Sequence, residues 1–242
     1  MLCAAHPESI PFEKNNIGNF GYIKSFHSFA PSMEIKDRIK QKADELYRKY
    51  GIKAVTMDEI ASQLGVSKKT IYHCFSDKNE LVDAVIVDML HYNRECCQRD
   101  KSNANNAIEE VYLAMEMLQT MFENMNPSIL FDIERNHPAT YEKFRQHKYN
   151  FLYQVVKDNI ERGQREDLYR PEIDADVVAT IRLETMMMPF NEDLFPKSKY
   201  SLVLLQQQLI EYYLFGLASL KGFKLIAKYQ KERSDRMNKK EV

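Results

Sequence analysis

Three helix-start signals follow one another closely in the first third of the chain, and their spacing strongly constrains the fold. Thr56 with Glu59, and Asp77 with Glu80, are capping boxes. In each, the first side chain accepts a hydrogen bond from a backbone amide of the new helix. Ser67 supplies an N-cap between them. A glycine separates the first two signals, so the sequence predicts two short helices joined by a tight turn and followed by a longer helix.

Apolar residues at helical spacing surround these signals. Residues 33–50 carry an apolar stripe with spacings of three and four, and Gly51 follows, where a left-handed residue commonly ends a helix. Gly65 ends the first short helix in the same way. The inner faces of the two short helices are then formed by Ile60, Ala61, Leu64, Ile71, Tyr72 and Phe75. This arrangement predicts a helix-turn-helix unit.

The rest of the chain is a run of predicted helices, and no segment alternates apolar and polar residues as a strand does. A count of only 7 glycines and 8 prolines in 242 residues agrees with an all-α fold. The longer helix is expected to run to about Arg94, and Gly163 to end the helix at 140–162. The other expected segments are an Asn-rich loop at 101–110, helices at 108–124, 174–188 (capped by Asp174) and 198–217, and a short helix after Gly222.

The predicted domains follow from these elements. Residues 33–80 form a three-helix helix-turn-helix domain, residues 81–231 a larger helical domain, and residues 232–242 a charged tail. Residues 1–32 hold three of the eight prolines and show no helical period. We expect a disordered arm or a mis-assigned start there. An arm that enters a DNA minor groove is disfavoured, because residues 1–32 contain only two lysines and no arginine.

Charge and cysteine content narrow the function only by exclusion. Lys and Arg number 34 against 35 Asp and Glu, so a nucleic-acid-binding chain of this composition needs a local basic surface. The cysteines form no C-x-x-C pair and no cluster with zinc spacing, so we expect free thiols, a cytoplasmic protein, and neither metal nor cofactor. A thiol sensor at Cys74, Cys96 or Cys97 stays open, since it requires a depressed pKa. No apolar run reaches the roughly 18 residues of a membrane span, so no membrane partner is expected.

The second short helix carries the candidate DNA contacts, because in a helix-turn-helix this helix enters the major groove. Lysine donates to guanine or phosphate, and threonine offers a methyl group and a hydroxyl. Thr56 and Lys78 each lie at a helix N-terminus, where backbone amides favour a phosphate. A merely solvated face is disfavoured, because the lysines gather on the groove side. The groove-facing residues are Ser67, Lys68, Lys69, Thr70 and His73.

The segment from Ile35 to Val85 resembles the DNA-binding domain of the TetR family of bacterial transcriptional regulators, through "GIKAVTMDEIASQLGVSKKTIYHCFSDKNELV". The resemblance implies an all-helical homodimer. Its small N-terminal domain would bind a palindromic double-stranded DNA operator, and its larger domain an effector. It adds Tyr72 to the DNA contacts. The chain departs from the family at Cys74, where a histidine or another polar residue is common, so a phosphate contact there is unsupported.

The resemblance also implies a dimer interface, a four-helix bundle from the last two long helices of each subunit. Monomeric core is the alternative interpretation. The candidate interface residues are Leu202, Leu205, Leu209, Tyr212 and Tyr213. Methionine is soft and adaptable, and its density on two helices suggests a pocket for an apolar small molecule, although plain core filling explains it equally well. The candidate pocket residues are Met117, Met121, Phe122, Phe144, Phe151 and Met187.

The function that these observations favour is a transcriptional repressor released from its operator by a small-molecule effector. A helix-turn-helix activator and a ligand-independent regulator share the same fold and remain alternatives. A helical protein-interaction scaffold is a third. An enzyme is disfavoured, because the chain contains no G-x-S-x-G, P-loop, dinucleotide fingerprint or H-E-x-x-H motif.

Overall fold

A computed structural model describes residues 34–238, and the expectation for residues 1–32 lies outside them. The described chain is α-helical throughout, apart from turns, one π-helical turn and one 3₁₀ turn. Its one β-type pairing is a single antiparallel bridge between Tyr169 and Ala218. The predicted all-α fold is therefore confirmed.

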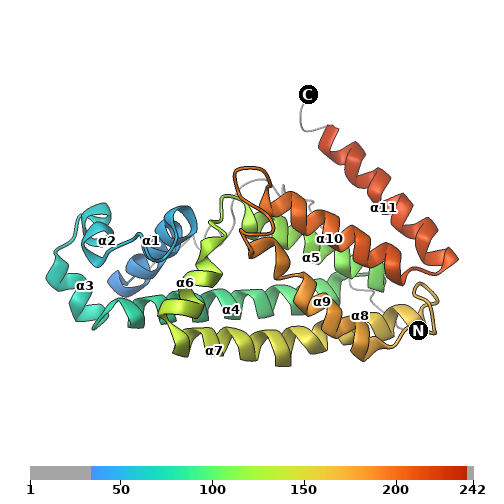
Figure 1. The fold of residues 1–242 in the computed structure, drawn as a ribbon, viewed down its shortest axis with the longest axis horizontal. Coiled ribbons are helices and arrows are strands. Elements are labelled where there is room, and N and C mark those ends of the chain that lie inside the picture. Colours follow the sequence, from blue (N-terminus) through green and yellow to red (C-terminus); the bar gives the residue numbers. More distant parts are fainter. Residues whose placement is uncertain (1–33, 239–242) are drawn as a thin grey trace, which may run out of the picture. The chain divides into compact units, whose positions relative to one another are not determined.

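The first helices form the predicted helix-turn-helix unit, and α1, α2 and α3 gather at the N-terminal end of α4 (Figure 1). The caps act as predicted: the side chains of Thr56, Ser67 and Asp77 accept from the backbone amides of Glu59, Thr70 and Glu80. Gly65 has φ +65°, in the left-handed region that a glycine enters without strain. The helices are α1 (Ile35–Tyr50), α2 (Met57–Leu64), α3 (Lys68–Cys74) and α4 (Lys78–Asn103).

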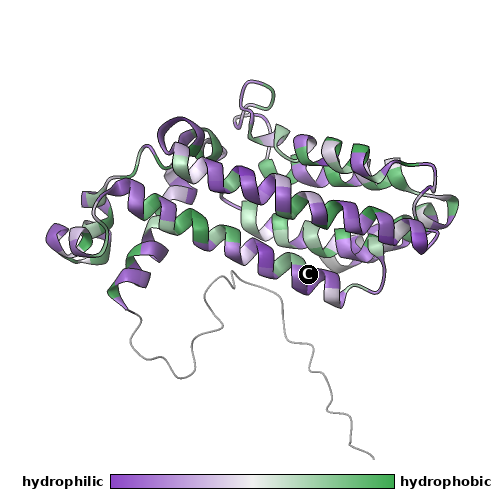
Figure 2. Ribbon diagram, turned by 90° about the horizontal axis from the view of Figure 1, so that it is seen from below, coloured by the Kyte–Doolittle hydropathy of each residue, from purple (hydrophilic) through white to green (hydrophobic). Residues whose placement is uncertain are grey.

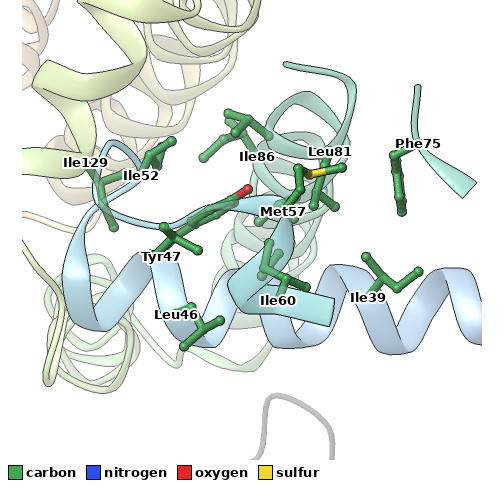
Figure 3. Packing of buried hydrophobic residues seen from close by; sticks show 14 of the residues in the cluster. Ile39, Leu46, Tyr47, Ile52, Met57, Ile60, Phe75, Leu81, Ile86 and Ile129 are labelled. Carbon is green, nitrogen blue, oxygen red and sulfur yellow. The ribbon is translucent and has the colours of Figure 1, made fainter. Parts of the chain in front are cut away.

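One hydrophobic cluster holds this unit together and extends into the larger domain. Tyr47, Ile60 and Phe75 bring α1, α2 and the end of α3 into contact, and Leu81 adds α4 (Figure 3). Ile129 of the larger domain belongs to the same cluster. Full burial of one such side chain stabilises the fold by about 1.5–3 kcal/mol. The helix-turn-helix unit is therefore packed against the rest of the chain.

The predicted Asn-rich loop is wrong in extent. Helix α4 does not end near Arg94 but continues to Asn103, so the loop shrinks to residues 104–106. The side chain of Asn106 accepts from the amide of Glu109 and caps α5 (Ala107–Phe122). The Glu109 carboxylate in turn accepts from the amide of Asn105. These two contacts form a capping box, so part of the polar stretch starts a helix instead of a loop.

Helices α6 to α8 follow, and the predicted long helix is confirmed with altered ends. α7 (Pro138–Gln146) passes through the π-helical turn His147–Leu152 into α8 (Tyr153–Arg165) without a break. Gly163 does not end this helix. It lies buried within α8, where a Cβ atom would meet the ring of Tyr169 at 2.0 Å. The glycine is needed because that ring packs on the backbone. The helix before them is α6 (Ser128–Asn136).

The C-terminal helices complete the larger domain. Asp174 caps α9 (Ala175–Thr185) as predicted, and the 3₁₀ turn Met188–Phe190 follows. α10 (Leu202–Leu217) packs against α5, and apolar and polar residues alternate around the long helices (Figure 2). The predicted short last helix and tail are corrected: α11 (Leu220–Asn238) is 19 residues long. It runs on because Arg233 is buried and donates to Gln119.

Candidate nucleic-acid interface and buried cavity

Helix α3 presents a polar face to solvent because Ile71 and Phe75 occupy its buried side. The hydroxyls of Ser67 and Thr70 lie 2.8 Å apart at its first turn. Of the predicted groove-facing residues, the structure exposes Ser67, Lys68, Lys69 and His73, and leaves Thr70 half-buried. The Tyr72 ring is 43 % exposed beside them. The predicted contacts therefore share one accessible surface, but no DNA contact is tested by it.

The two lysines of α3 differ in their surroundings. Lys68 Nζ lies 2.7 Å from Asp58 Oδ1, and this side-chain hydrogen bond raises the pKa of Lys68. Both partners are exposed, and exposed ion pairs contribute little to stability. Lys68 can therefore exchange Asp58 for a phosphate at small cost. Within the described residues, Lys69 has no ion-pair or hydrogen-bond partner for its ammonium group.

The flanking helix N-termini are organised differently from each other. Thr56 is exposed at the start of α2. Lys78 is half-buried, and its Nζ donates to the carbonyl of Ile52 at 2.6 Å, while burial lowers the pKa of its ammonium group. Lys78 therefore ties α4 to the turn after α1. The predicted phosphate contact of Lys78 therefore rests on its place at the helix N-terminus, because its ammonium group is engaged by the Ile52 carbonyl. Cys74 packs partly against the core, which accounts for the absence of a polar residue there.

A cavity of about 170 Å³ lies in the larger domain, walled by α4, α5, the π-helical turn, α8, α9 and α10. Five of the six predicted pocket residues line it, namely Met117, Met121, Phe122, Phe144 and Met187. Phe151 lies outside it. Its ring packs on His147, with centroids 5.1 Å apart, and under the guanidinium of Arg94 at 4.3 Å. The methionine pattern thus identified residues of a cavity wall.

Several polar groups reach this cavity. His147 Nε2 lies 2.8 Å from Asn93 Oδ1, and burial lowers the pKa of His147 to about 4, so the ring is neutral at pH 7. Glu110 pairs with Arg162 at 3.0 Å. Burial raises the pKa of the Cys97 thiol to about 12, which is the opposite of what a thiol sensor requires. No group of three or more His, Cys, Asp or Glu in the described chain could hold a metal ion.

Arg182 is the cavity residue that the sequence prediction missed. It is 5 % exposed, its Nη1 has no hydrogen-bond partner, and its guanidinium lies 5.3 Å from the ring centroid of Tyr213. Burial lowers the pKa of this arginine. The signal was available: Ala179, Leu183 and Met186 form an apolar stripe on α9, and Arg182 stands within it.

An exposed apolar face covers α9 and α10. Its prominent members are Val177, Ile181, Leu204, Tyr212 and Phe215, and Tyr212 is 82 % exposed. Among the predicted interface residues, only Tyr212 lies fully on this face. Leu202, Leu205 and Leu209 are half-buried, and Tyr213 instead lines the cavity. Steps of four lead from Tyr212 to Gln208 and Leu204, all three exposed, whereas Leu205 and Leu209 each follow one residue later and turn toward the half-buried side of α10.

Hydrogen bonds join the cavity wall to the helix-turn-helix unit. Arg48 at the end of α1 donates to the carbonyl of Met121 at 2.9 Å, and Met121 lines the cavity. Asp132 of α6 accepts from the amide of Lys53, in the turn between α1 and α2, at 3.0 Å. The amide of Asn126 donates to the Arg48 carbonyl. These hydrogen bonds tie the end of α5 and the start of α6 to the end of α1 and the turn after it.

Comparison with known proteins agrees with this architecture. Residues 39–85 match the profile of the bacterial regulatory proteins of the tetR family. An HTH-type transcriptional regulator of Staphylococcus aureus is 27 % identical over 131 residues, which cover 53 % of this chain and 70 % of the relative. The HTH-type transcriptional repressor KstR2 of Mycolicibacterium smegmatis is 22 % identical over 146 residues, 59 % of this chain and 71 % of the relative.

A solved structure extends the likeness to the larger domain. It is a transcriptional regulator from Saccharomonospora viridis in complex with choline, with a TM-score of 0.64 and 20 % identity. The match covers 76 % of this chain and 97 % of that one, and at this identity it shows the fold alone. A search of the described helices for one long and apolar enough to cross a membrane finds none.

Proposed function

Because this chain belongs to the TetR family and is a DNA-binding transcriptional regulator, we propose that it represses transcription and leaves its operator when a small molecule fills the cavity. The observation that carries this proposal is the shared wall. Met121 lines the cavity and also accepts a hydrogen bond from Arg48 at the end of α1. A ligand that favours one position of α5 therefore favours one position of the helix-turn-helix unit. The name of the repressor KstR2 supports repression by analogy.

The release step follows from differential affinity. An effector shifts the population only by the difference between its affinities for the DNA-competent and the DNA-incompetent state. The apolar cavity offers such a difference, because a ligand that fills it would change how α5 packs. The hydrogen bonds of Asp132 and Arg48 then transmit the change. By linkage, bound DNA must lower the affinity for the effector by the same factor by which the bound effector lowers the affinity for DNA.

Two copies of the chain would present two recognition helices to a palindromic operator, which requires a two-fold dimer. The exposed apolar face of α9 and α10 supports this assembly, since an uncovered patch of this kind is costly in water. Leu204→Glu should reduce the mass measured by size-exclusion chromatography with light scattering from dimer to monomer. Phe131→Glu is the matched control, because Phe131 is equally exposed but lies on α6. A dimer that survives Leu204→Glu counts against this interface.

The DNA-binding test uses fluorescence anisotropy with the duplex that precedes the protein's own gene. Lys68→Ala and Lys69→Ala should each weaken binding and lower the slope of log K against log salt by about 0.9 per lost phosphate contact. Lys101→Ala is the matched control: Lys101 pairs with Asp158 at 2.7 Å, as Lys68 does with Asp58, but lies at the far end of α4. Unchanged dissociation constants in both α3 variants would refute the assignment of this surface.

A further inference from the structure

The environment of Arg182 differs from that of the half-buried Arg162 and the buried Arg233. Arg162 pairs with Glu110 and Glu166, and Arg233 donates to Gln119. Among the described residues, no carboxylate lies within ion-pair distance of Arg182, and no side chain or carbonyl accepts from its guanidinium. A buried cation without a partner costs several kcal/mol, so its retention in the cavity wall needs an explanation.

Packing alone does not provide one. The guanidinium carbon of Arg182 lies 5.3 Å from the ring centroid of Tyr213, in a cation–π contact. That contact leaves the in-plane N–H groups unsatisfied, and Nη1 is one of them. A planar guanidinium with free N–H groups is suited to binding a carboxylate through two parallel hydrogen bonds. The missing partner is therefore an anion, and carboxylate geometry fits it.

The acids that line the same cavity are engaged elsewhere. Glu110 is held by Arg162 at 3.0 Å, and Asp100 lies 3.5 Å from Arg99. Burial also raises the pKa of Asp100. The ring of His147 is neutral there. The charge without a counter-ion is thus positive, which favours an anionic ligand over a cation such as the choline of the Saccharomonospora viridis structure.

The other residues of the cavity wall indicate the chemistry of the rest of the ligand. Most of them are apolar, among them Met117, Met121, Leu152 and Phe190. A dry cavity of roughly 150 Å³ accommodates benzene, so a cavity of about 170 Å³ accommodates an apolar body of about six to eight carbons. We propose that the effector is a small monocarboxylate with such a body, an aryl or short acyl acid, whose carboxylate binds Arg182. This inference rests on the proposed function of the cavity.

The test is isothermal titration of the full chain, without DNA, against two pairs of probes of matched size. These are benzoate with benzyl alcohol, and octanoate with octan-1-ol. We expect at least one acid to bind at least about tenfold more tightly than its alcohol. Arg182→Met should remove that preference and leave the alcohol's affinity unchanged, and Arg182→Lys should restore part of it. Circular dichroism and the urea midpoint show whether each variant folds. If a variant does not fold, the replacement test is whether the acid raises the urea midpoint of the wild-type chain more than its alcohol does.

Two outcomes overturn the inference: equal affinity of acid and alcohol for the wild-type chain, or an Arg182→Met variant that keeps the acid preference. Failure of the proposed function has a different signature. If an acid binds through Arg182 but the operator anisotropy stays unchanged at saturating acid, the site is correct and the release mechanism is wrong. If choline releases the operator while neither acid binds, the release mechanism stands and the carboxylate assignment falls.

Discussion

Acidification should destabilise this protein through His147, and the size of the effect follows from its burial. The ring lies in the π-helical turn, almost fully buried, with its Nε2 against Asn93 Oδ1 at 2.8 Å. Burial is the main cause that lowers the pKa of His147 to about 4, and the positive charge of Arg94 adds to it. In the unfolded chain the same ring titrates near 6.5. The folded state therefore takes up this proton later than the unfolded state.

The sign and the pH window follow from linkage. Above about pH 6.5 the ring is neutral in both states, and the stability it contributes is fully present. As the pH falls, the unfolded state binds the proton first, so stability is lost between about pH 6.5 and 4. For these two pKa values the loss between pH 7.5 and pH 5 is about 2 kcal/mol. Because the ring borders a cavity that water can screen, the expected loss is about 1–2 kcal/mol.

The assay is urea unfolding followed by circular dichroism at pH 7.5 and pH 5, at one protein concentration. His147→Gln keeps a donor for Asn93 and removes the titration, so the variant should lose about 1–2 kcal/mol less than the wild-type chain. His73→Gln is the matched control, because it makes the same substitution at an exposed position on α3. Burial also lowers the pKa of His137, so the wild-type chain and both variants share the loss in the free energy of unfolding that His137 causes on acidification. Equal losses in wild type and His147→Gln would refute the reasoning.

Three further predictions concern packing, coupling and thiol chemistry. Gly163→Ala forces a Cβ into the Tyr169 ring and should cost about 1–3 kcal/mol, whereas Gly216→Ala, which meets open space within α10, should be neutral or stabilise by up to about 1 kcal/mol in urea melts. Asp132→Ala removes the acceptor for the Lys53 amide and should cost about 1–3 kcal/mol, with exposed Asp235→Ala unchanged as control. Cys97 should react with iodoacetamide at pH 8 at least about tenfold more slowly than Cys74, as mass spectrometry of the peptides will show.

Local signals were sufficient to predict the DNA-binding unit. A capping side chain and the amide that it binds lie two or three residues apart, so Thr56, Ser67 and Asp77 identified their helices without tertiary information. Asp174 did the same for α9. Because the exposed face of α3 is the complement of its buried side, the candidate DNA contacts followed from the same pattern.

Distant packing explains the errors. Gly163 looked like a helix end, because glycine often ends a helix, but the ring of Tyr169 requires it inside α8. Gly222 lies within α11 for a similar reason, since a Cβ there would meet the carbonyl oxygen of Leu168 at 2.0 Å. Neither partner is identifiable from residues three or four apart. The end of α4 was misplaced differently: the Asn106 and Glu109 capping box is local, and the density of asparagines around it obscured the signal.

The cavity combines both situations. Its apolar wall was foreseen from methionine density, because that property belongs to single helices. Its charge was not, since Arg182 becomes unusual only when the fold buries its guanidinium beside Tyr213 of α10 with no carboxylate near it. An arginine in an apolar stripe normally extends its charged end to water. Here the guanidinium stays buried beside the ring of Tyr213. A sequence pattern can therefore locate the wall of a cavity in such a chain, whereas the charge inside the cavity depends on which buried group the fold leaves without a partner.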